Sequence, residues 1–281
     1  MQTIASITDS ACDLDLNTLR ENNINLLPLR IIYSNGDYRD RLDISPQEVY
    51  DNLEKEVPKT SLPSAQETEE TLNKLEEEGY THVICISISS GLSGSFNAIR
   101  LALEDHPKLT SFVYDSKILA YPQGEIVLEV AKLIKEGKSF EEIVKEIPEI
   151  RKRVIGYFTI NTLEYLKKGG RIGRLAGTVG ELLNLKPIIT TDEDGVYYNV
   201  AKVRGRKQSL SKMTELLKEY LAKGKCEVAV LHAGCEDEAI KYMNSLKDLT
   251  NVVSIKIAEI SPALGIHGGP GLIGFSVKMV K

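Results

Sequence analysis

The segment 84–99 constrains the fold of this chain more than any other. An apolar, β-branched run over residues 83–88 stops abruptly at serines and glycines, and residues 95–103 then have the composition and apolar spacing of a helix. This pattern predicts a buried strand, a tight polar turn and a helix. Its hydroxyls and glycines stand beside the free N–H groups of a helix N-terminus, which predicts a small anion site; a serine-capped turn without a ligand is the alternative. The turn residues concerned are Ser89, Ser90, Gly91, Ser93 and Gly94.

The same alternation of strand and helix runs through the first half of the chain. Ser45, Ser64 and Ser139 are each followed by glutamate three residues later, a capping-box spacing that predicts three helix starts. Strands that alternate with helices pair in parallel and bind ligands at their carboxyl ends, where Asp9 and Asp115 also fall. Because the GxGxxG and P-loop patterns are both absent, we expect no nucleotide here.

The secondary structure of two connecting segments in the first half can also be predicted. Residues 26–33 read as a single strand that ends at the turn Asn35 and Gly36. Thr60 and Ser61 are expected in a loop just ahead of the helix that Ser64 begins.

The second half of the chain changes character. A helix is predicted over 175–185, followed by a hairpin of residues 187–191 and 196–203 around a glycine turn. A hairpin among helices favours an α+β or mixed-sheet domain distinct from the first, and we expect a mixed-sheet α/β domain. We place the boundary near residue 152, giving domains 1–152 and 153–281. Because no Pro/Gly/Ser-rich linker separates them, we expect the two domains to pack tightly. The chain closes with a glycine-rich segment, 261–271, and an alternating strand.

Composition limits the classes of function. The chain has 281 residues, of which 42% are hydrophobic and 27% charged, which is typical of a soluble protein with about two domains. The net charge of -5 argues against a nucleic-acid surface or a polybasic membrane patch. No window approaches the ~18 apolar residues of a membrane span, so we expect no stable membrane insertion and at most transient membrane contact. The four cysteines form no C-x-x-C pair, which favours a reducing cytoplasm.

Basic residues beside glycines complete the candidate site. His267 is expected in a glycine-rich loop that lets backbone and imidazole approach a bound group, although a turn histidine bonded to backbone is the equal alternative. Arg171 and Arg204 each adjoin a glycine or a glycine pair and offer a bidentate fork to an anion; surface solvation is the default for either.

The order of these motifs resembles the DegV family, whose long-chain fatty-acid-binding members include the binding subunits of bacterial fatty acid kinase. The likeness spans residues 3–280 and rests on I-T-D-S-A-C-D-L, K-T-S-L-P-S, S-S-G-L-S-G-S-F, Y-L-K-K-G-G-R-I, V-R-G and H-G-G-P-G-L-I-G. The resemblance implies two α/β domains that enclose one acyl chain, such as palmitate, in a tunnel. It implies a cytoplasmic lipid-binding protein, not an enzyme, that needs no metal or cofactor and presents the carboxylate to a kinase partner.

The resemblance also assigns residues. It implies that Thr60 and Ser93 hold the carboxylate, and that Ser61, Arg171, Arg204 and His267 lie near the head group. One departure is visible, because Leu62 stands where the family commonly has glutamine.

Simple energetics separate the roles of tail and head group. Burying a methylene contributes about 0.8 kcal/mol, so some fifteen contribute roughly 12 kcal/mol before ordering costs. A hydroxyl hydrogen bond to a charged group adds only about 1.5–3 kcal/mol. We therefore expect the tail to dominate affinity, while Thr60 and Ser93 orient the carboxylate.

Two enzyme classes compete with this interpretation. Ser93, Asp115 and His267 occur in the order of an α/β serine hydrolase triad. The nucleophile elbow G-x-S-x-G counts against it, because Ser95 occupies the position of the second glycine. A small-molecule kinase is the other rival, and the chain lacks a nucleotide-phosphate loop for it.

Overall fold

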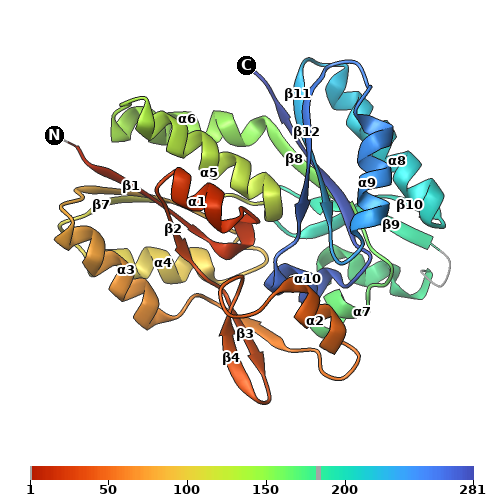
Figure 1. Ribbon diagram of the computed structural model, residues 1–281, viewed down its shortest axis with the longest axis horizontal. Helices are drawn as coiled ribbons and strands as arrows, with labels where there is room; N and C mark the ends of the chain where they lie inside the picture. The colour runs from red at the N-terminus through yellow and green to blue at the C-terminus, as the bar shows by residue number, and fades with distance from the viewer. Residues whose placement is uncertain (1, 182–184) are drawn as a thin grey trace.

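A parallel sheet forms the centre of the first half, with strand order β2-β1-β6-β7. Figure 1 presents the computed structural model, which describes residues 2–181 and 185–281. The strands are β1 (Ile4–Asp9), β2 (Ile24–Leu27), β6 (His82–Ser87) and β7 (Thr110–Asp115). Both β1 and β6 are buried almost throughout, as their apolar runs predict for a sheet covered on both faces.

Helices cover both faces of this sheet. Figure 1 shows α3 (Ala65–Glu77) and α4 (Ser95–Glu104) on one side, and α5 (Ala120–Lys135) and α6 (Phe140–Lys152) on the other. The predicted caps are confirmed, because Ser64 and Ser139 accept the N–H of the glutamate three residues later. A short helix, α1 (Leu16–Glu21), follows the 3-10 turn η1 (Ser10–Cys12) at the end of β1.

A small antiparallel sheet, β4-β3-β5, lies beside the parallel one and contains β3 (Arg30–Tyr33), β4 (Gly36–Arg39) and β5 (Lys59–Ser61). Two predictions are wrong here. The single strand over 26–33 is two strands in different sheets, because Pro28 carries no N–H and interrupts the ladder. Thr60 and Ser61 are not in a loop; β5 pairs with β3 and places Thr60 opposite Ile31. The helix α2 (Pro46–Asn52) begins at the predicted capping box.

The second half forms a mixed sheet of order β10-β9-β8-β13-β11-β12, as predicted. Its strands are β8 (Val154–Thr159), β9 (Leu185–Thr191), β10 (Tyr197–Arg204), β11 (Cys226–His232), β12 (Val252–Glu259) and β13 (Ile273–Met279). The pair β11 and β12 is parallel, and the other pairs are antiparallel. The helices α8 (Arg206–Leu221) and α9 (Glu236–Leu246) pack against this sheet. The protein is therefore an α/β fold with a parallel sheet and a mixed sheet, and the division near residue 152 stays our proposal.

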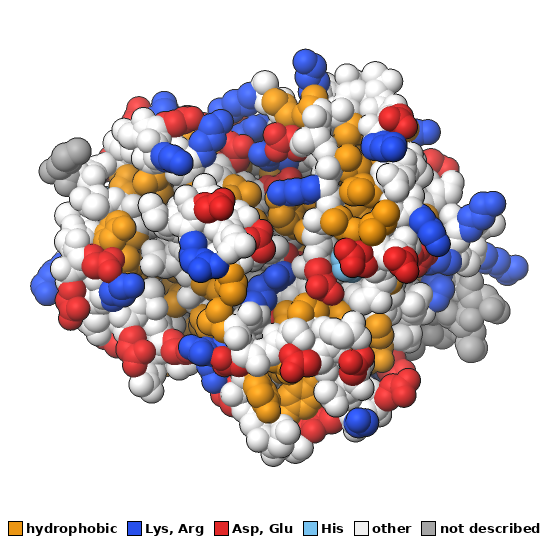
Figure 2. All heavy atoms as spheres, viewed as in Figure 1, with side chains coloured by type: hydrophobic (Ala, Val, Ile, Leu, Met, Phe, Trp, Pro, Cys, Tyr) orange, Lys and Arg blue, Asp and Glu red, His pale blue; other side chains and the backbone are white. Residues whose placement is uncertain are grey.

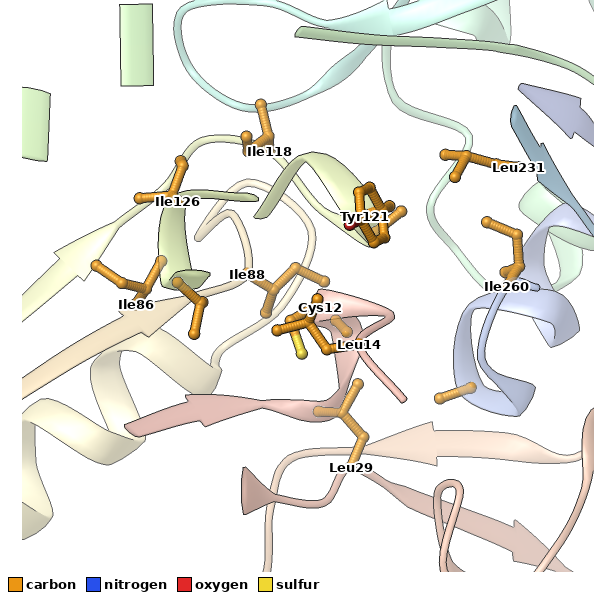
Figure 3. Packing of buried hydrophobic residues seen from close by; sticks show 14 of the residues in the cluster. Cys12, Leu14, Leu29, Ile86, Ile88, Ile118, Tyr121, Ile126, Leu231 and Ile260 are labelled. Atoms are coloured by element: carbon orange, nitrogen blue, oxygen red, sulfur yellow. The ribbon is translucent and has the colours of Figure 1, made fainter. Parts of the chain in front are cut away.

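The two halves share one hydrophobic core. Figure 3 shows Tyr121, on α5, between Leu231 and Ile260 of the second half and Ile86 and Ile88 of the first. All five side chains are at least nine-tenths buried. The contact between the halves is thus continuous with the interior of the first half, which fixes their relative placement.

Two glycine-rich segments differ from their predictions. Residues 173–181 form a 3-10 helix, η2 (Gly173–Glu181), and Leu185 already belongs to β9, so the predicted helix over 175–185 is wrong at both ends; residues 182–184 lie outside the described residues. Gly173 and Gly177 weaken α-helix propensity there. The segment after Ser261 is not a loop but a helix, α10 (Pro262–Gly268), with Ser261 as N-cap and proline at its first position. A further short helix, α7 (Glu164–Lys168), precedes Gly169.

Charge and hydrophobicity are mixed on the surface. In Figure 2, basic and acidic side chains are interspersed over the described part of the visible face, with hydrophobic side chains between them. This face carries no continuous field of one sign. None of the helices in the described ranges combines the length and apolar character needed to cross a membrane.

Candidate functional site

A cavity of about 220 Å³ lies where the small sheet, the turn after β6 and α10 meet. Five of the six predicted site residues line it, and they come from four separate segments of the chain: Thr60, Ser61, Ser93, Arg171 and His267. The remaining walls are largely apolar, contributed by Leu29, Leu62, Ile88, Leu92, Leu119, Tyr197, Ala263 and Leu264. The structure therefore brings polar groups that are distant in sequence to one hollow with an apolar lining.

Thr60 and His267 contact each other across the two halves of the chain. The Thr60 hydroxyl lies 2.7 Å from Nε2 of His267, which sits in the last turn of α10. Burial, followed by the positive charge of Arg171, lowers the pKa of His267 to about 4, so the ring is neutral at pH 7. Its Nδ1 has no hydrogen-bond partner among the described residues and faces Gly169. A Cβ added to Gly169 would lie 2.1 Å from this Nδ1. Glycine at 169 is thus required by the ring.

Ser93 lies two residues before Ser95, the first residue of α4. Its hydroxyl oxygen accepts the N–H of Ser95 at 3.2 Å and lies 2.8 Å from the Ser95 hydroxyl. The N-cap position itself is Gly94, which has no side chain to bond the helix end. Ser93 therefore places a hydroxyl beside the N–H groups of the first turn of α4, where negative charge is favoured.

Arg171 provides the positive charge of the cavity. Its Nε donates to the carbonyl of Leu92 at 3.2 Å, and its Nη1 donates to the carbonyl of Gly169 at 2.6 Å. No carboxylate of the described residues pairs with this guanidinium. Because backbone carbonyls hold it in place without cancelling its charge, Arg171 remains available to an anion in the cavity.

Arg204 lies elsewhere. It is the last residue of β10, its side chain is exposed, and it does not line the cavity. The structure therefore does not bring Arg204 to the other candidates, and its assignment to the head-group region stays a prediction.

The serine turn after β6 serves two purposes. Of its three serine hydroxyls only that of Ser93 lines the cavity, and its role in binding an anion stays a prediction. Ser89 is fully buried and donates to the carbonyl of Gly195 at 2.8 Å, and Ser90 accepts from Nζ of Lys117 at 2.9 Å. A Cβ at Gly91 would lie 2.8 Å from the Gly195 carbonyl oxygen. Ser89 and Gly91 therefore contact the turn between β9 and β10, while Ser90 contacts the segment after β7. The glycine at 91 permits close approach of protein backbone, not of a ligand.

The structure does not support the serine hydrolase alternative, because it does not bring Ser93, Asp115 and His267 together as a triad. Asp115 accepts the N–H of Ser90 at 3.0 Å and pairs with Lys117 at 2.8 Å, and it does not line the cavity. The Nε2 of His267 bonds Thr60, and the Ser93 hydroxyl bonds Ser95. In the described ranges, no group of three His, Cys, Asp or Glu side chains is arranged to hold a metal ion.

A second, apolar pocket of about 50 Å³ adjoins the polar cavity. The two share the lining residues Leu119, Tyr197 and Leu264. The apolar pocket runs between α5 and the mixed sheet, past Pro122, Gly156, Phe158, Thr190, Leu231, Ile260 and Leu272. The sequence did not identify Tyr197 as a site residue. The feature that could have indicated it is its position two residues after Gly195, in the turn that Ser89 bonds.

Comparison with known proteins identifies the family. The family model described as "Uncharacterised protein, DegV family" matches residues 3–279. A DegV domain-containing protein of Clostridium perfringens is 50% identical over 278 residues, which cover 99% of each chain. The crystal structure of DegV, a fatty acid binding protein from Bacillus subtilis, has a TM-score of 0.92 at 31% identity and covers 100% of both chains. A fat acid (stearic acid)-binding protein from Eubacterium ventriosum has a TM-score of 0.87 at 28% identity, with 99% of this chain and 98% of that chain covered. The chain belongs to the DegV family.

Proposed function

We propose that this protein binds one long-chain fatty acid, with its carboxylate in the polar cavity and its acyl chain in the adjoining apolar pocket, which together form a buried tunnel. The observation that carries the proposal is the sharing of Leu119, Tyr197 and Leu264 by the two spaces. The Bacillus subtilis and Eubacterium ventriosum structures, described as fatty acid and stearic acid binding, support it.

The polar end suits a carboxylate. Thr60 and Ser93 each offer a hydroxyl, and Arg171 adds a positive charge that no carboxylate of the described residues neutralises. Neutral His267 bonds the Thr60 hydroxyl and holds it in place. Hydrogen bonds to an ionised acceptor contribute about 1.5–3 kcal/mol each, whereas a buried tail contributes far more. These residues therefore set the register of the ligand more than its affinity.

We further propose that the protein is a cytoplasmic carrier which presents the carboxylate for phosphorylation by a kinase partner. Leu62 lines the polar cavity and is 36% exposed, so the head-group end lies near the surface. Phosphorylation adds negative charge and acceptor oxygens, which Arg171 is placed to bind. In this account the protein needs no metal or cofactor, and palmitate is a representative ligand.

Competition binding tests the first proposal. A fluorescent long-chain fatty acid is bound to delipidated protein and displaced by palmitate or acetate at low and high ionic strength. We expect displacement by palmitate alone, with little effect of salt, because a buried tail is not screened. Equal displacement by acetate, or a strong loss of binding in salt, contradicts a buried acyl chain.

The kinase proposal needs its own assay. Loaded protein is mixed with ATP and a purified catalytic subunit of a bacterial fatty acid kinase, and acyl phosphate is trapped with hydroxylamine. Formation of the hydroxamate only in the presence of both proteins supports presentation. Its absence, with fatty acid still bound, removes the kinase step and leaves the binding function intact.

A further inference from the structure

The helix α10 is a wall of the polar cavity although it belongs to the second half of the chain. Ala263, Leu264 and His267 all line the cavity. On its other side, the Tyr50 ring of α2 packs against α10 at Gly265. The position of α10 therefore determines whether His267 contacts Thr60. This helix contacts both α2 and α7, and Figure 1 shows it beside α2, at the junction of the two halves.

Two buried carboxylates from the first half bind the first turn of α10. Asp13 accepts the N–H of Ser261 at 2.9 Å, and Asp40 accepts the N–H of Ala263 at 2.9 Å. Both carboxylates are fully buried. Burial raises the pKa of Asp40 to about 6, so this group is ionised at neutral pH. Ionised acceptors at helix N–H groups make strong hydrogen bonds and favour the positive end of the helix dipole.

Asp40 also reaches the opposite wall of the cavity. Its second oxygen accepts the Ser10 hydroxyl at 2.6 Å, and the Ser10 oxygen in turn accepts the N–H of Leu29 at 3.0 Å. Leu29 and Ala263 both line the cavity. One carboxylate thus ties together two cavity walls that come from different halves of the chain.

Arg41 completes the connection beside Asp13. Its Nη2 lies 3.0 Å from the Asp13 carboxylate and donates to the carbonyl of Glu259, at the end of β12, at 2.9 Å. Asp13 and Arg41 have φ angles of 53° and 65°, in the left-handed region that non-glycine residues seldom adopt. The surrounding contacts hold both residues in this costly conformation, as is common where structure serves function.

We propose that Asp40, assisted by Asp13, is a positioning residue for ligand recognition: it seats α10 so that His267 holds the Thr60 hydroxyl toward the carboxylate. This role rests on the fatty-acid-binding function proposed above. Asp40 does not touch the ligand, since it does not line the cavity. It acts through Ala263 and the helix that carries His267.

The substitution Asp40→Asn tests the proposal with little change in size. Asparagine offers one acceptor atom where the carboxylate offers two, so it cannot accept from both Ser10 and Ala263. We expect a fluorescent fatty acid to dissociate about tenfold faster from this variant. The matched control is Asp43→Asn, because Asp43 pairs with Arg39 and does not touch α10; its dissociation rate should stay at the wild-type value.

A double-mutant cycle separates positioning from general stability. If Asp40 acts through His267, adding Asp40→Asn to a His267→Gln background should accelerate dissociation much less than it does in the wild type. Additive losses contradict the proposal, because a merely structural role would affect both backgrounds alike. Should Asp40→Asn fail to fold, Asp13→Asn removes the other anchor, at Ser261, and the same comparison decides.

The ring ¹⁵N spectrum of His267 tests the position of α10 in protein that holds no ligand. The chain has four histidines, so the ring ¹⁵N signals of His267 are assigned by their loss in His267→Gln. At pH 7.5, delipidated wild type should show one fixed neutral tautomer, since Thr60 bonds Nε2 and Nδ1 backs onto Gly169. Asp40→Asn should show averaged tautomers; an unchanged spectrum overturns the proposal. If the wild type binds no fatty acid, the proposed function fails, while this spectrum still decides the role of Asp40.

Discussion

Replacing Thr60 with valine removes one hydroxyl and almost no volume. The Thr60 side chain lines the polar cavity and bonds Nε2 of His267 at 2.7 Å. In our account the hydroxyl also donates to the ligand carboxylate, an ionised acceptor. Losing such a hydrogen bond costs about 1.5–3 kcal/mol, which corresponds to about a 10- to 150-fold weaker binding of palmitate.

The comparison of two ligands makes this prediction specific. Hexadecanol has the same tail as palmitate but an uncharged head group, so Thr60→Val should weaken its binding much less. Because the apolar pocket is untouched, both ligands should still bind. Affinities are measured by displacement of a fluorescent fatty acid from delipidated protein, at a pH near 7.5 where the palmitate carboxylate is ionised.

A matched control removes a threonine hydroxyl outside the site. Thr71, on α3, donates to the carbonyl of Glu67 within its own helix, and Thr71→Val should leave the affinity for both ligands unchanged. Thermal unfolding should show that Thr60→Val keeps a stability close to that of wild type. Equal losses for palmitate and hexadecanol would refute the reasoning, because they would place the effect of Thr60 on the tail or on the fold.

Three further predictions follow from buried and site groups. His267, with a pKa of about 4 against an ordinary 6.5, binds no proton in the folded state over a window where the unfolded chain does, so stability should fall as the pH drops from about 6.5 to 4. Urea unfolding should show this loss, about 1–3 kcal/mol for a partly buried ring, in wild type and not in His267→Gln. Burial raises the pKa of Glu125 from an ordinary 4.5 to about 8, so in this window the folded state keeps a proton that the unfolded chain releases, and stability should fall as the pH rises from about 4.5 to 8. Glu125→Gln should therefore gain a few kcal/mol over wild type between pH 5 and 8.5, a gain that Glu129→Gln, whose carboxylate pairs with Lys278, should not show. His267→Ala should reduce acyl-phosphate formation with a kinase more than fatty-acid affinity; equal losses in the two assays would assign His267 to the fold or to the unphosphorylated ligand.

Local signals in the sequence were sufficient for most elements of the fold. The β-branched run that contains Ile84 and the capping serines Ser45, Ser64 and Ser139 predict strands and helix starts that the structure has. These signals succeed because capping and strand burial depend on neighbours within a few residues.

The wrong predictions fall where contacts with residues distant in sequence determine the secondary structure. Thr60 lies in a strand because β3 is available to pair with it, and the segment after Ser261 becomes a helix although glycines 265 and 268 disfavour one. Two N–H groups of that first turn find buried carboxylates more than 200 residues earlier in sequence, a pairing no local window contains. Tertiary contacts thus override local propensity at both places.

The candidate site divides in the same way. Residue types and motif order pointed to Thr60, Ser93, Arg171 and His267, and the structure places all four on one cavity. Neither type nor order could separate Arg171 from Arg204, since both are arginines beside glycine. The structure distinguishes them, because Arg204 lies at the exposed end of β10 whereas Arg171 lines the cavity. The role of Ser89 likewise depends on Gly195, which lies 106 residues away.

Mass spectrometry of an organic extract tests the central claim most directly. Purified protein is extracted without added lipid, and fatty acids are quantified against the protein concentration, with heat-denatured and rewashed protein as the blank. Our account predicts about one long-chain fatty acid per chain. An extract without fatty acid, from protein that also fails to take up palmitate after delipidation, would contradict it.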